Sequence, residues 1–272
     1  MPQFLSGGVN IYYEEHGKGE TLMLMAGFGQ DPSAWLEQLE AYARFFHVVL
    51  IDIRGGGRSG VPDAPFTPRE LAADILGLMD TLSIKRAHFG GFSLGGAAGM
   101  ELAAAHPGRV ASLSLHSTWE ATQPYPHFRQ WIEIRQRVIA QNDPVVNLGT
   151  RFVSFFSPEF LNERPDRIEL FIARAKANPH PITAKGIEAQ GQACISHDVR
   201  DRLGMIRTPT LITVGTKDRT TLPAASEFLH RRIAGSEYVV INGAGHCTMF
   251  QCPEEFTSIS LGFLMKHAGR NV

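Results

Sequence analysis

Short apolar runs that alternate with amphipathic stretches constrain the fold of this chain more than any other feature of its sequence. The runs are mostly apolar and lie at residues 22–25, 48–51, 87–92, 110–115, 211–214 and 238–241. Such runs are typical of strands that are covered on both faces, as in a parallel sheet. Residues 9–13 alternate in polarity instead, which favours an edge strand.

Stretches with helical character separate these runs, at residues 32–45, 68–82, 93–105, 222–233 and 253–267. Pro32 and Pro68 stand where a first helical turn accepts proline. The stretch 93–105 is rich in Gly and Ala, which predicts a helix packed closely on a sheet. Strands alternating with helices indicate βαβ units, so we predict the α/β class, with a doubly wound, mostly parallel sheet flanked by helices.

The alternation stops between about Thr118 and Arg207, where prolines and aromatic residues are frequent. Helical periodicity persists there at residues 128–139 and 166–177. This pattern favours an inserted helical cap rather than a second independent domain. We therefore expect a core formed by residues 1–118 and 208–272, with the cap at 119–207.

Composition argues against several partners. The 26 Lys and Arg residues nearly balance the 27 Asp and Glu residues, so nothing in the charge attracts a nucleic acid or an anionic membrane surface. No secretory signal or membrane-spanning run is evident. Cys194, Cys247 and Cys252 stand at no metal spacing and suit a reducing compartment. We expect a cytoplasmic protein with a small-molecule substrate, and the oligomeric state is left open.

The strongest local motif is a G-x-S-x-G sequence, Gly91 to Gly95, between a predicted strand and a Gly/Ala-rich helix. A serine on such a sharp turn has a strained backbone, which is tolerated only if the residues two positions away lack bulk. Gly91 and Gly95 meet that requirement. The turn would expose Ser93 at a helix N-terminus, which favours developing negative charge. Ser93 is therefore the predicted nucleophile.

A serine nucleophile requires a base, and His246 is the best candidate among eleven histidines. It follows a glycine-rich loop after the last predicted strand, at the sheet edge where catalytic groups of open α/β sheets gather. Asp218 follows the preceding strand and reaches the same edge. It would accept a hydrogen bond from the imidazole and stabilise its charged form. Glu120, after the run 110–115, is a weaker rival for this role.

The oxyanion formed during acyl transfer requires backbone N–H donors. We expect one from Leu94, the residue after the nucleophile, and one from Phe28, in the loop after the run 22–25.

A cofactor and a metal are not expected. Residues 55–60 match G-x-G-x-x-G after a strand, but three prolines follow within residues 61–68 and prevent the helix that a dinucleotide site requires. Histidines and cysteines do not occur at metal-ligand spacing.

Taken together, these motifs resemble the α/β-hydrolase superfamily over nearly the whole chain. Residues 52–59 look like its D-x-R-G-x-G-x-S loop, and the order Ser93, Asp218, His246 is the order of its triad. Serine at the elbow disfavours the dehalogenases and epoxide hydrolases of this fold, and Gly96 departs from the prolyl aminopeptidases. The layout is similar to haloperoxidase-like esterases, lactonases and carbon–carbon bond hydrolases. One departure is Ala26-Gly27, where the family usually has His-Gly.

The resemblance implies hydrolysis of a small or medium carboxylic ester or lactone through an acyl-enzyme. Three alternatives remain open: perhydrolase or haloperoxidase-like activity, carbon–carbon bond hydrolysis, and a ligand-binding or sensor protein with negligible turnover. We expect aromatic residues of the cap to line an apolar substrate pocket, and the candidates are Trp119, Phe128, Trp131, Phe152, Phe155 and Phe156.

Overall fold

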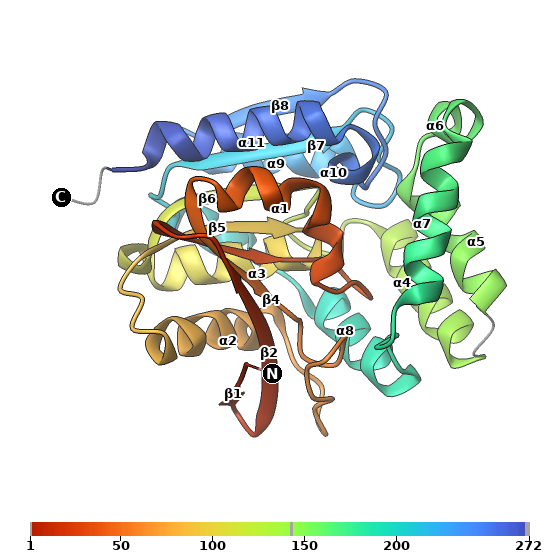
Figure 1. Ribbon diagram of the computed structural model, residues 1–272, viewed down its shortest axis with the longest axis horizontal. Coiled ribbons are helices and arrows are strands. Elements are labelled where there is room, and N and C mark those ends of the chain that lie inside the picture. The colour runs from red at the N-terminus through yellow and green to blue at the C-terminus, as the bar shows by residue number, and fades with distance from the viewer. Residues whose placement is uncertain (1, 142–143, 270–272) are drawn as a thin grey trace.

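A mostly parallel sheet forms the centre of the computed structural model, which describes residues 2–141 and 144–269 (Figure 1). The sheet has eight strands in the order β1-β2-β4-β3-β5-β6-β7-β8. Strands β3 to β8 run parallel, and β2 is antiparallel to β4. The strands are β1 Gln3–Ser6, β2 Val9–His16, β3 Glu20–Met25, β4 Phe46–Ile51, β5 Ala87–Phe92, β6 Val110–His116, β7 Thr210–Gly215 and β8 Glu237–Ile241.

The central strands confirm the prediction drawn from the apolar runs. Every residue of β5, β6 and β7 is buried, because helices cover both faces of the sheet. The edge of the sheet differs from the prediction that residues 9–13 form an edge strand. A further short strand, β1, pairs antiparallel with β2, so β2 is not the edge strand. Gly7 and Gly8 both have positive φ, which allows the tight turn that joins the two strands.

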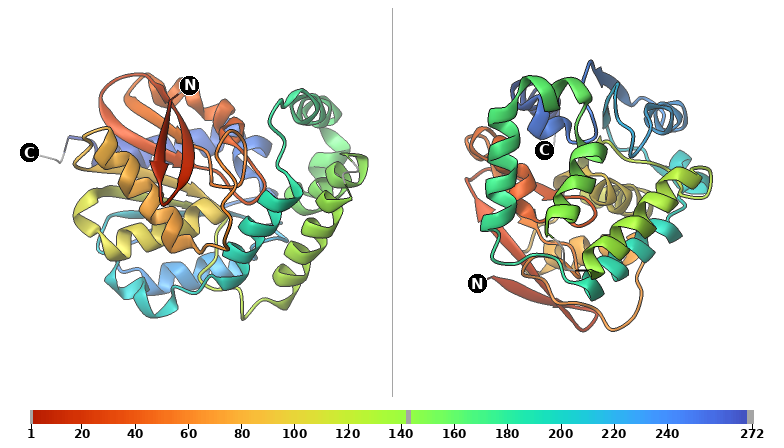
Figure 2. Two further views of the ribbon diagram at one scale, coloured as in Figure 1. Left: turned by 90° about the horizontal axis from the view of Figure 1, so that it is seen from below. Right: turned by 90° about the vertical axis from the view of Figure 1, so that its right-hand side faces the viewer.

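Helices lie on both sides of the sheet, as expected for a doubly wound fold. Helices α1 (Leu36–Ala43) and α11 (Pro253–His267) pack together on one side, and α2 (Pro68–Thr81), α3 (Leu94–Ala105) and α9 (Pro223–Arg232) lie on the other (Figure 2). The short helices η1 (Pro32–Trp35), η2 (Pro107–Arg109) and α10 (Thr248–Gln251) complete this part of the chain. No helix among the described residues is long and apolar enough to cross a membrane.

Close packing of α3 on the sheet explains its small residues. A Cβ on Gly96 would lie 2.7 Å from the Cβ of Thr118, and one on Gly99 would lie 2.7 Å from the ring of Phe89. Larger side chains would force the helix away from the strands. The start of α2 is fixed by a capping box, in which the Thr67 and Glu70 side chains satisfy each other's backbone N–H groups. No helix begins between residues 52 and 67, so the glycines at 55–60 lack the helix that a dinucleotide site requires.

Five α-helices lie between β6 and β7 in the described residues, grouped at one end of the sheet (right in Figure 1). They are α4 Pro126–Ala140, α5 Pro144–Phe155, α6 Pro158–Glu163, α7 Pro165–Ala177 and α8 Ala184–Ser196. Helices α4 and α7 match the predicted periodic stretches, whereas α5, α6 and α8 were not predicted. All five fall within residues 119–207, the segment that we propose as a cap.

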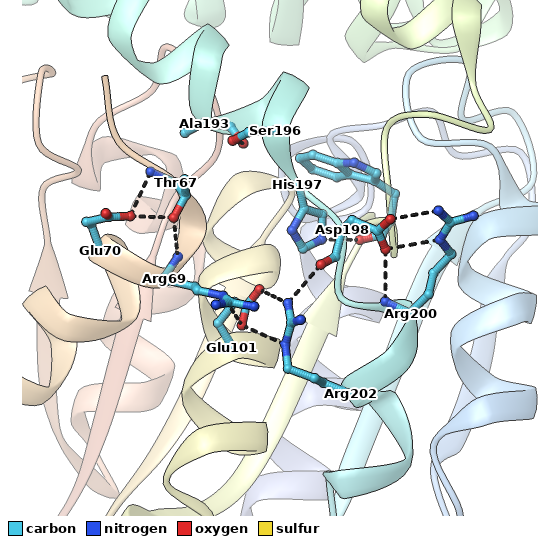
Figure 3. Close-up of polar contacts among 11 residues, drawn as sticks. Thr67, Arg69, Glu70, Glu101, Ala193, Ser196, His197, Asp198, Arg200 and Arg202 are labelled. Carbon is cyan, nitrogen blue, oxygen red and sulfur yellow. Dashed lines mark hydrogen bonds and ion pairs between the residues drawn. The ribbon is translucent and has the colours of Figure 1, made fainter. Parts of the chain in front are cut away.

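The return from the cap to the core is tied down by ion pairs (Figure 3). Glu101 of α3 is almost fully buried and accepts hydrogen bonds from Arg202 at 2.6 and 3.3 Å. Arg202 belongs to η3 (Arg200–Met205), which follows α8, and it also donates to the Asp198 carbonyl. Arg69 of α2 lies 3.6 Å from the same carboxylate. One buried carboxylate thus joins two core helices to the segment that leaves the cap.

Two buried histidines are held in the neutral form. Burial lowers the pKa of His116, in β6, to about 3 and the pKa of His197, after α8, to about 4. His197 Nε2 donates to the Trp119 carbonyl at 3.0 Å, which links the two ends of the cap segment. Because an unfolded histidine titrates near pH 6.5, the unfolded chain binds protons between that pH and the folded pKa, whereas the folded chain does not. Acid therefore destabilises the fold.

We predict that His197→Gln reduces the acid sensitivity of folding. Glutamine keeps an N–H donor for the Trp119 carbonyl but does not titrate. As the pH is lowered from 6.5 to 5, the free energy of unfolding should decrease more for the unsubstituted protein than for the variant. The difference should grow by about 1.4 kcal/mol per pH unit. Urea unfolding at several pH values measures this difference. Parallel curves for the two proteins would contradict the assignment.

Candidate active site

Ser93 stands at a strained turn between β5 and α3. Its backbone has φ 53° and ψ −114°, and residues other than glycine rarely adopt such a positive φ. The Ser93 N–H donates to the His116 carbonyl at 2.9 Å, which fixes the turn to the neighbouring strand. Ser93 is 4 % exposed. The structure therefore forms the strand–turn–helix elbow that the sequence predicts.

Close backbone contacts explain both glycines of the elbow. A Cβ on Gly91 would lie 2.3 Å from the Gly95 carbonyl oxygen. A Cβ on Gly95 would lie 2.3 Å from the Met25 oxygen and 2.6 Å from the Ala26 oxygen. These neighbours are backbone atoms, so a side chain at either position would displace the chain itself. The elbow is thus packed directly on the loop that follows β3.

His246 and Asp218 form a buried hydrogen-bonded pair. The His246 Nδ1 atom lies 2.8 Å from Asp218 Oδ2, and both side chains are almost completely buried. Asp218 is held in turn by the backbone N–H groups of Thr220 and Thr221, at 2.8 and 3.0 Å, and by the Thr221 hydroxyl at 3.0 Å. These donors hold the carboxylate in place against the imidazole, so that it can fix the imidazole tautomer.

Glu120, the rival acid, lies elsewhere. Its Oε1 accepts a hydrogen bond from the Tyr125 hydroxyl at 2.9 Å, and burial raises the pKa of this carboxyl. Among the described residues, the carboxylate that hydrogen-bonds His246 is that of Asp218.

The His246 ring lies against the elbow. Its centroid is 4.8 Å from that of Phe92, the residue before the nucleophile, and 5.8 Å from that of Phe155. Because Nδ1 faces Asp218, Nε2 lies on the opposite side of the ring. In the part of the chain that the structure describes, Ser93 Oγ and His246 Nε2 are not joined by a hydrogen bond. Catalytic hydrogen bonds commonly tighten only when substrate binds.

The loop after β3 adjoins the nucleophile. A Cβ on Gly27 would lie 3.0 Å from the Cβ of Ser93, and the Gly95 N–H donates to the Ala26 carbonyl at 3.0 Å. Among the described residues, no acceptor is found for the backbone N–H of Phe28 or of Leu94. Both donors are therefore available at the positions predicted for an oxyanion hole.

Two glutamines that the sequence did not reveal hold this loop. Gln30 Oε1 accepts from the Gly27 N–H at 3.2 Å, and Gln190 Oε1, from cap helix α8, accepts from the Gly29 N–H at 2.9 Å. They give the loop side-chain support although Ala26 replaces the histidine that the resemblance leads one to expect. No sequence pattern identifies these two glutamines. Gln190 in particular is 161 positions from Gly29.

A third glutamine, Gln251 of α10, joins the His246 loop to the cap. Its Nε2 donates to the Ser157 hydroxyl at 2.8 Å and to the Gly243 carbonyl at 3.1 Å. Its Oε1 accepts from the Gly245 N–H at 3.0 Å. The Cys247 N–H also donates to the Phe155 carbonyl at 3.0 Å. The end of α5 is thus docked on the loop that carries His246.

A cavity next to the loop after β3 does not have the predicted aromatic lining. It has a volume of about 700 Å³, and its walls include Gly29, Gln30, Arg151 and Cys247. The six predicted aromatic residues are absent from these walls, since their rings pack mainly on one another and on further interior residues. Ring contacts join Trp119 to Phe128, Phe128 to Trp131, Phe152 to Phe171, Phe155 to His246 and Phe156 to Phe250. They are therefore mostly interior side chains of the cap, and aromatic composition alone does not distinguish these two roles.

Comparison with known proteins identifies the family. The sequence model of the alpha/beta hydrolase fold family matches residues 20–253. The chain belongs to this family. This hydrolase is 30 % identical over 263 residues to RutD of Azorhizobium caulinodans, which bears a provisional name as a carbamate hydrolase; the match covers 97 % of this chain and 98 % of the relative.

Solved structures of hydrolases are also similar. The enol-lactonase from Burkholderia xenovorans LB400 has a TM-score of 0.84 and 27 % identity, covering 97 % of this chain and all of the other. A thermophilic esterase from Thermogutta terrifontis has a TM-score of 0.84 and 26 % identity, covering 98 % and 97 % of the two chains.

We predict that Gly95→Ala destabilises this hydrolase by about 2–4 kcal/mol, because the new methyl group would overlap two backbone carbonyls. Gly262→Ala is the matched control. Gly262 lies in α11 with open space around its Cβ position, so alanine should stabilise the helix by about 0.5–1 kcal/mol. Urea unfolding measures both changes. A neutral Gly95→Ala would show that the elbow tolerates a side chain.

Proposed function

We propose that this protein is a serine hydrolase that cleaves a small or medium carboxylic ester or lactone through an acyl-enzyme. Ser93 is the nucleophile, His246 the general base and Asp218 the acid that orients the histidine. The observation that carries the proposal is the buried His246–Asp218 pair, 2.8 Å apart, packed against the elbow that bears Ser93. The similarity to an enol-lactonase and to an esterase supports the same reaction type.

In the proposed reaction, Ser93 Oγ transfers its proton to His246 Nε2 and attacks the substrate carbonyl carbon. The backbone N–H groups of Phe28 and Leu94 bind the oxyanion that develops. His246 then protonates the departing alkoxide, and an acyl-enzyme remains. A water molecule gives a proton to His246 and attacks the acyl group, after which the proton returns to Ser93 and the acid is released. No external oxidant or cofactor is needed.

A carbamate is a second candidate substrate, because full-length relatives at 27–30 % identity bear that name. The same residues could attack its carbonyl carbon. Assays of matched ethyl esters and ethyl carbamates separate the two candidates by their kcat/KM values. Three further assays test the remaining alternatives. With a nitrophenyl ester, a burst of nitrophenol without steady turnover indicates a binding protein. Loss of the colour of a dienolate substrate indicates carbon–carbon bond cleavage, and peracid formation from an acid and peroxide indicates a perhydrolase.

We predict that the two amide variants Asp218→Asn and Glu120→Gln differ sharply. Ser93→Ala should reduce the turnover of a 4-nitrophenyl ester by about 10⁶. Asp218→Asn should lower it by about 10⁴, because the histidine loses the acceptor that fixes its tautomer. Glu120→Gln should have little effect, since Glu120 bonds Tyr125. Steady-state kinetics measure all three, and the acid is misassigned if the two amide variants exchange their effects.

Thr221 is predicted to be a positioning residue. Its hydroxyl donates to Asp218 Oδ2 at 3.0 Å and lies 3.3 Å from His246 Nδ1. Thr221→Val removes one hydrogen bond to a charged group, so kcat should fall about 10-fold. Because Thr221 contacts the Asp218 carboxylate and does not line the cavity, KM should stay unchanged while kcat falls. Thr257→Val, on α11, is the control and should alter neither quantity.

A further inference from the structure

The cavity next to the loop after β3 is lined by residues that adjoin the proposed catalytic residues in the chain, although Ser93, Asp218 and His246 are not in its walls. It contacts Gly29 and Gln30, next to the Phe28 donor, and Cys247, next to His246. Gln30 is close to the nucleophile, because a Cβ on Gly27 would touch both the Gln30 amide oxygen, at 3.1 Å, and the Cβ of Ser93, at 3.0 Å. Helices α5 and α7 of the cap form the opposite wall. A substrate held at Ser93 would therefore extend into this space.

Arg151 of α5 is a cation of this wall without an acidic partner. Its Nη2 donates to the Gly29 carbonyl at 3.1 Å. Its Nε is buried and has no hydrogen-bond partner among the described residues. In that part of the chain, no carboxylate lies within ion-pair distance of Arg151. Burial lowers the pKa of its guanidinium. Arg151 is partly buried, and removing a cation from water without a counterion is costly, so an anion would stabilise this group.

A second buried arginine lies behind it. Arg135 of α4 is 1 % exposed, and its Nη1 donates only to neutral acceptors, the Asn147 backbone and side-chain oxygens and the Thr150 hydroxyl. Its Nη2 lies 3.8 Å from the position of a Cβ on Gly29. Burial and the charge of Arg151 lower the pKa of Arg135 to about 9. Two cations thus flank Gly29.

The nearby acids are already engaged. Asp31, in the cavity wall, accepts from the Ser33 N–H and from the Asn178 side chain, each at 2.8 Å. Glu37 is shared by two arginines of α7, Arg167 and Arg174. Lys176 adds another positive charge to the wall. The cavity therefore has an excess of positive charge, and Arg151 is the cation of its wall that contacts the loop after β3.

We propose that this cavity binds a carboxylate of the substrate through Arg151, so that the natural substrate is an ester or lactone with a second, free carboxylate group. This inference rests on the proposed function and names its substrate class. A planar guanidinium fits a carboxylate well. The carboxylate of Asp31 in the same cavity favours a monoanion over a doubly charged phosphate. Because Arg151 binds Gly29, one residue after Phe28, a short carbon chain would connect the carboxylate to the reacting carbonyl.

The test compares mono-4-nitrophenyl adipate with 4-nitrophenyl hexanoate, which have acyl chains of equal length and differ in the terminal carboxylate. The unsubstituted enzyme should have the higher kcat/KM on the adipate. Arg151→Met should lower kcat/KM on the adipate about 10- to 100-fold, mainly through KM, and change that on the hexanoate less than about threefold. Arg151→Lys should be intermediate. Arg129→Met, an exposed cap arginine paired with Glu133, removes the same charge and should change neither value.

Binding provides a readout that does not depend on turnover. Free adipate should bind Ser93→Ala in calorimetry, and binding should be lost in the double variant Ser93→Ala, Arg151→Met. Equal losses on both esters in Arg151→Met, or adipate binding that survives the double variant, would overturn the inference while leaving the proposed function intact. Failure of the enzyme to hydrolyse either ester, with adipate binding retained in Ser93→Ala, would instead reject the proposed function.

Discussion

The site depends on backbone segments that approach one another more closely than side chains would allow. Gly95 packs on the carbonyl groups of Met25 and Ala26, and a Cβ on Gly215 would lie 2.2 Å from the Ala244 oxygen. These contacts bring the loops after β3, β5, β7 and β8 together at the carboxyl ends of parallel strands. The strained turn at Ser93 persists because its surroundings leave no room for a relaxed conformation. The positions of the three proposed catalytic side chains follow from this packing.

The cap fixes the same loops from the other side. Gln190 holds the loop that carries Phe28, and Gln251 joins the loop of His246 to Ser157. The Thr220 hydroxyl donates to the Ser154 carbonyl, so the Asp218 loop is also bound to α5. The cap therefore contributes to the geometry of the site as well as covering it. Amide side chains suit this role because they donate and accept at once and do not change charge with pH.

The charge of the cavity supports the substrate class that we propose for this hydrolase. The alpha/beta hydrolase fold supports many reactions with one constellation of residues, so the fold alone says little about substrate. Arg135 is buried and Arg151 is partly buried, and neither gains an acidic partner within the described residues. Such an arrangement costs stability. A substrate that supplies the missing negative charge would recover part of that cost.

The sequence by itself determined the fold class, the elbow and the order of Ser93, Asp218 and His246. These features are local: apolar periodicity reports strands and helices, and two glycines around a serine report a turn that only small residues permit. Even the extra edge strand β1 has a local signal, the Gly7-Gly8 turn. The sequence could rank Asp218 above Glu120, but it could not show which of them meets His246.

Only the tertiary structure decided the contacts between distant residues. His246 and Asp218 meet because the loops after β7 and β8 adjoin, and Gln30 and Gln251 support neighbouring loops of the core. The contacts of Gln190 and Arg151 with Gly29 depend on how cap helices α8 and α5 lie on the sheet. The aromatic residues of the cap illustrate the limit. Their composition suits a pocket wall and an interior equally well, and the packing of α4 and α5 placed their rings mainly against other interior residues. Helix orientation, which local patterns do not specify, turned Arg151 of α5 toward the cavity, whereas Phe152 and Phe155 of the same helix pack on Phe171 and His246.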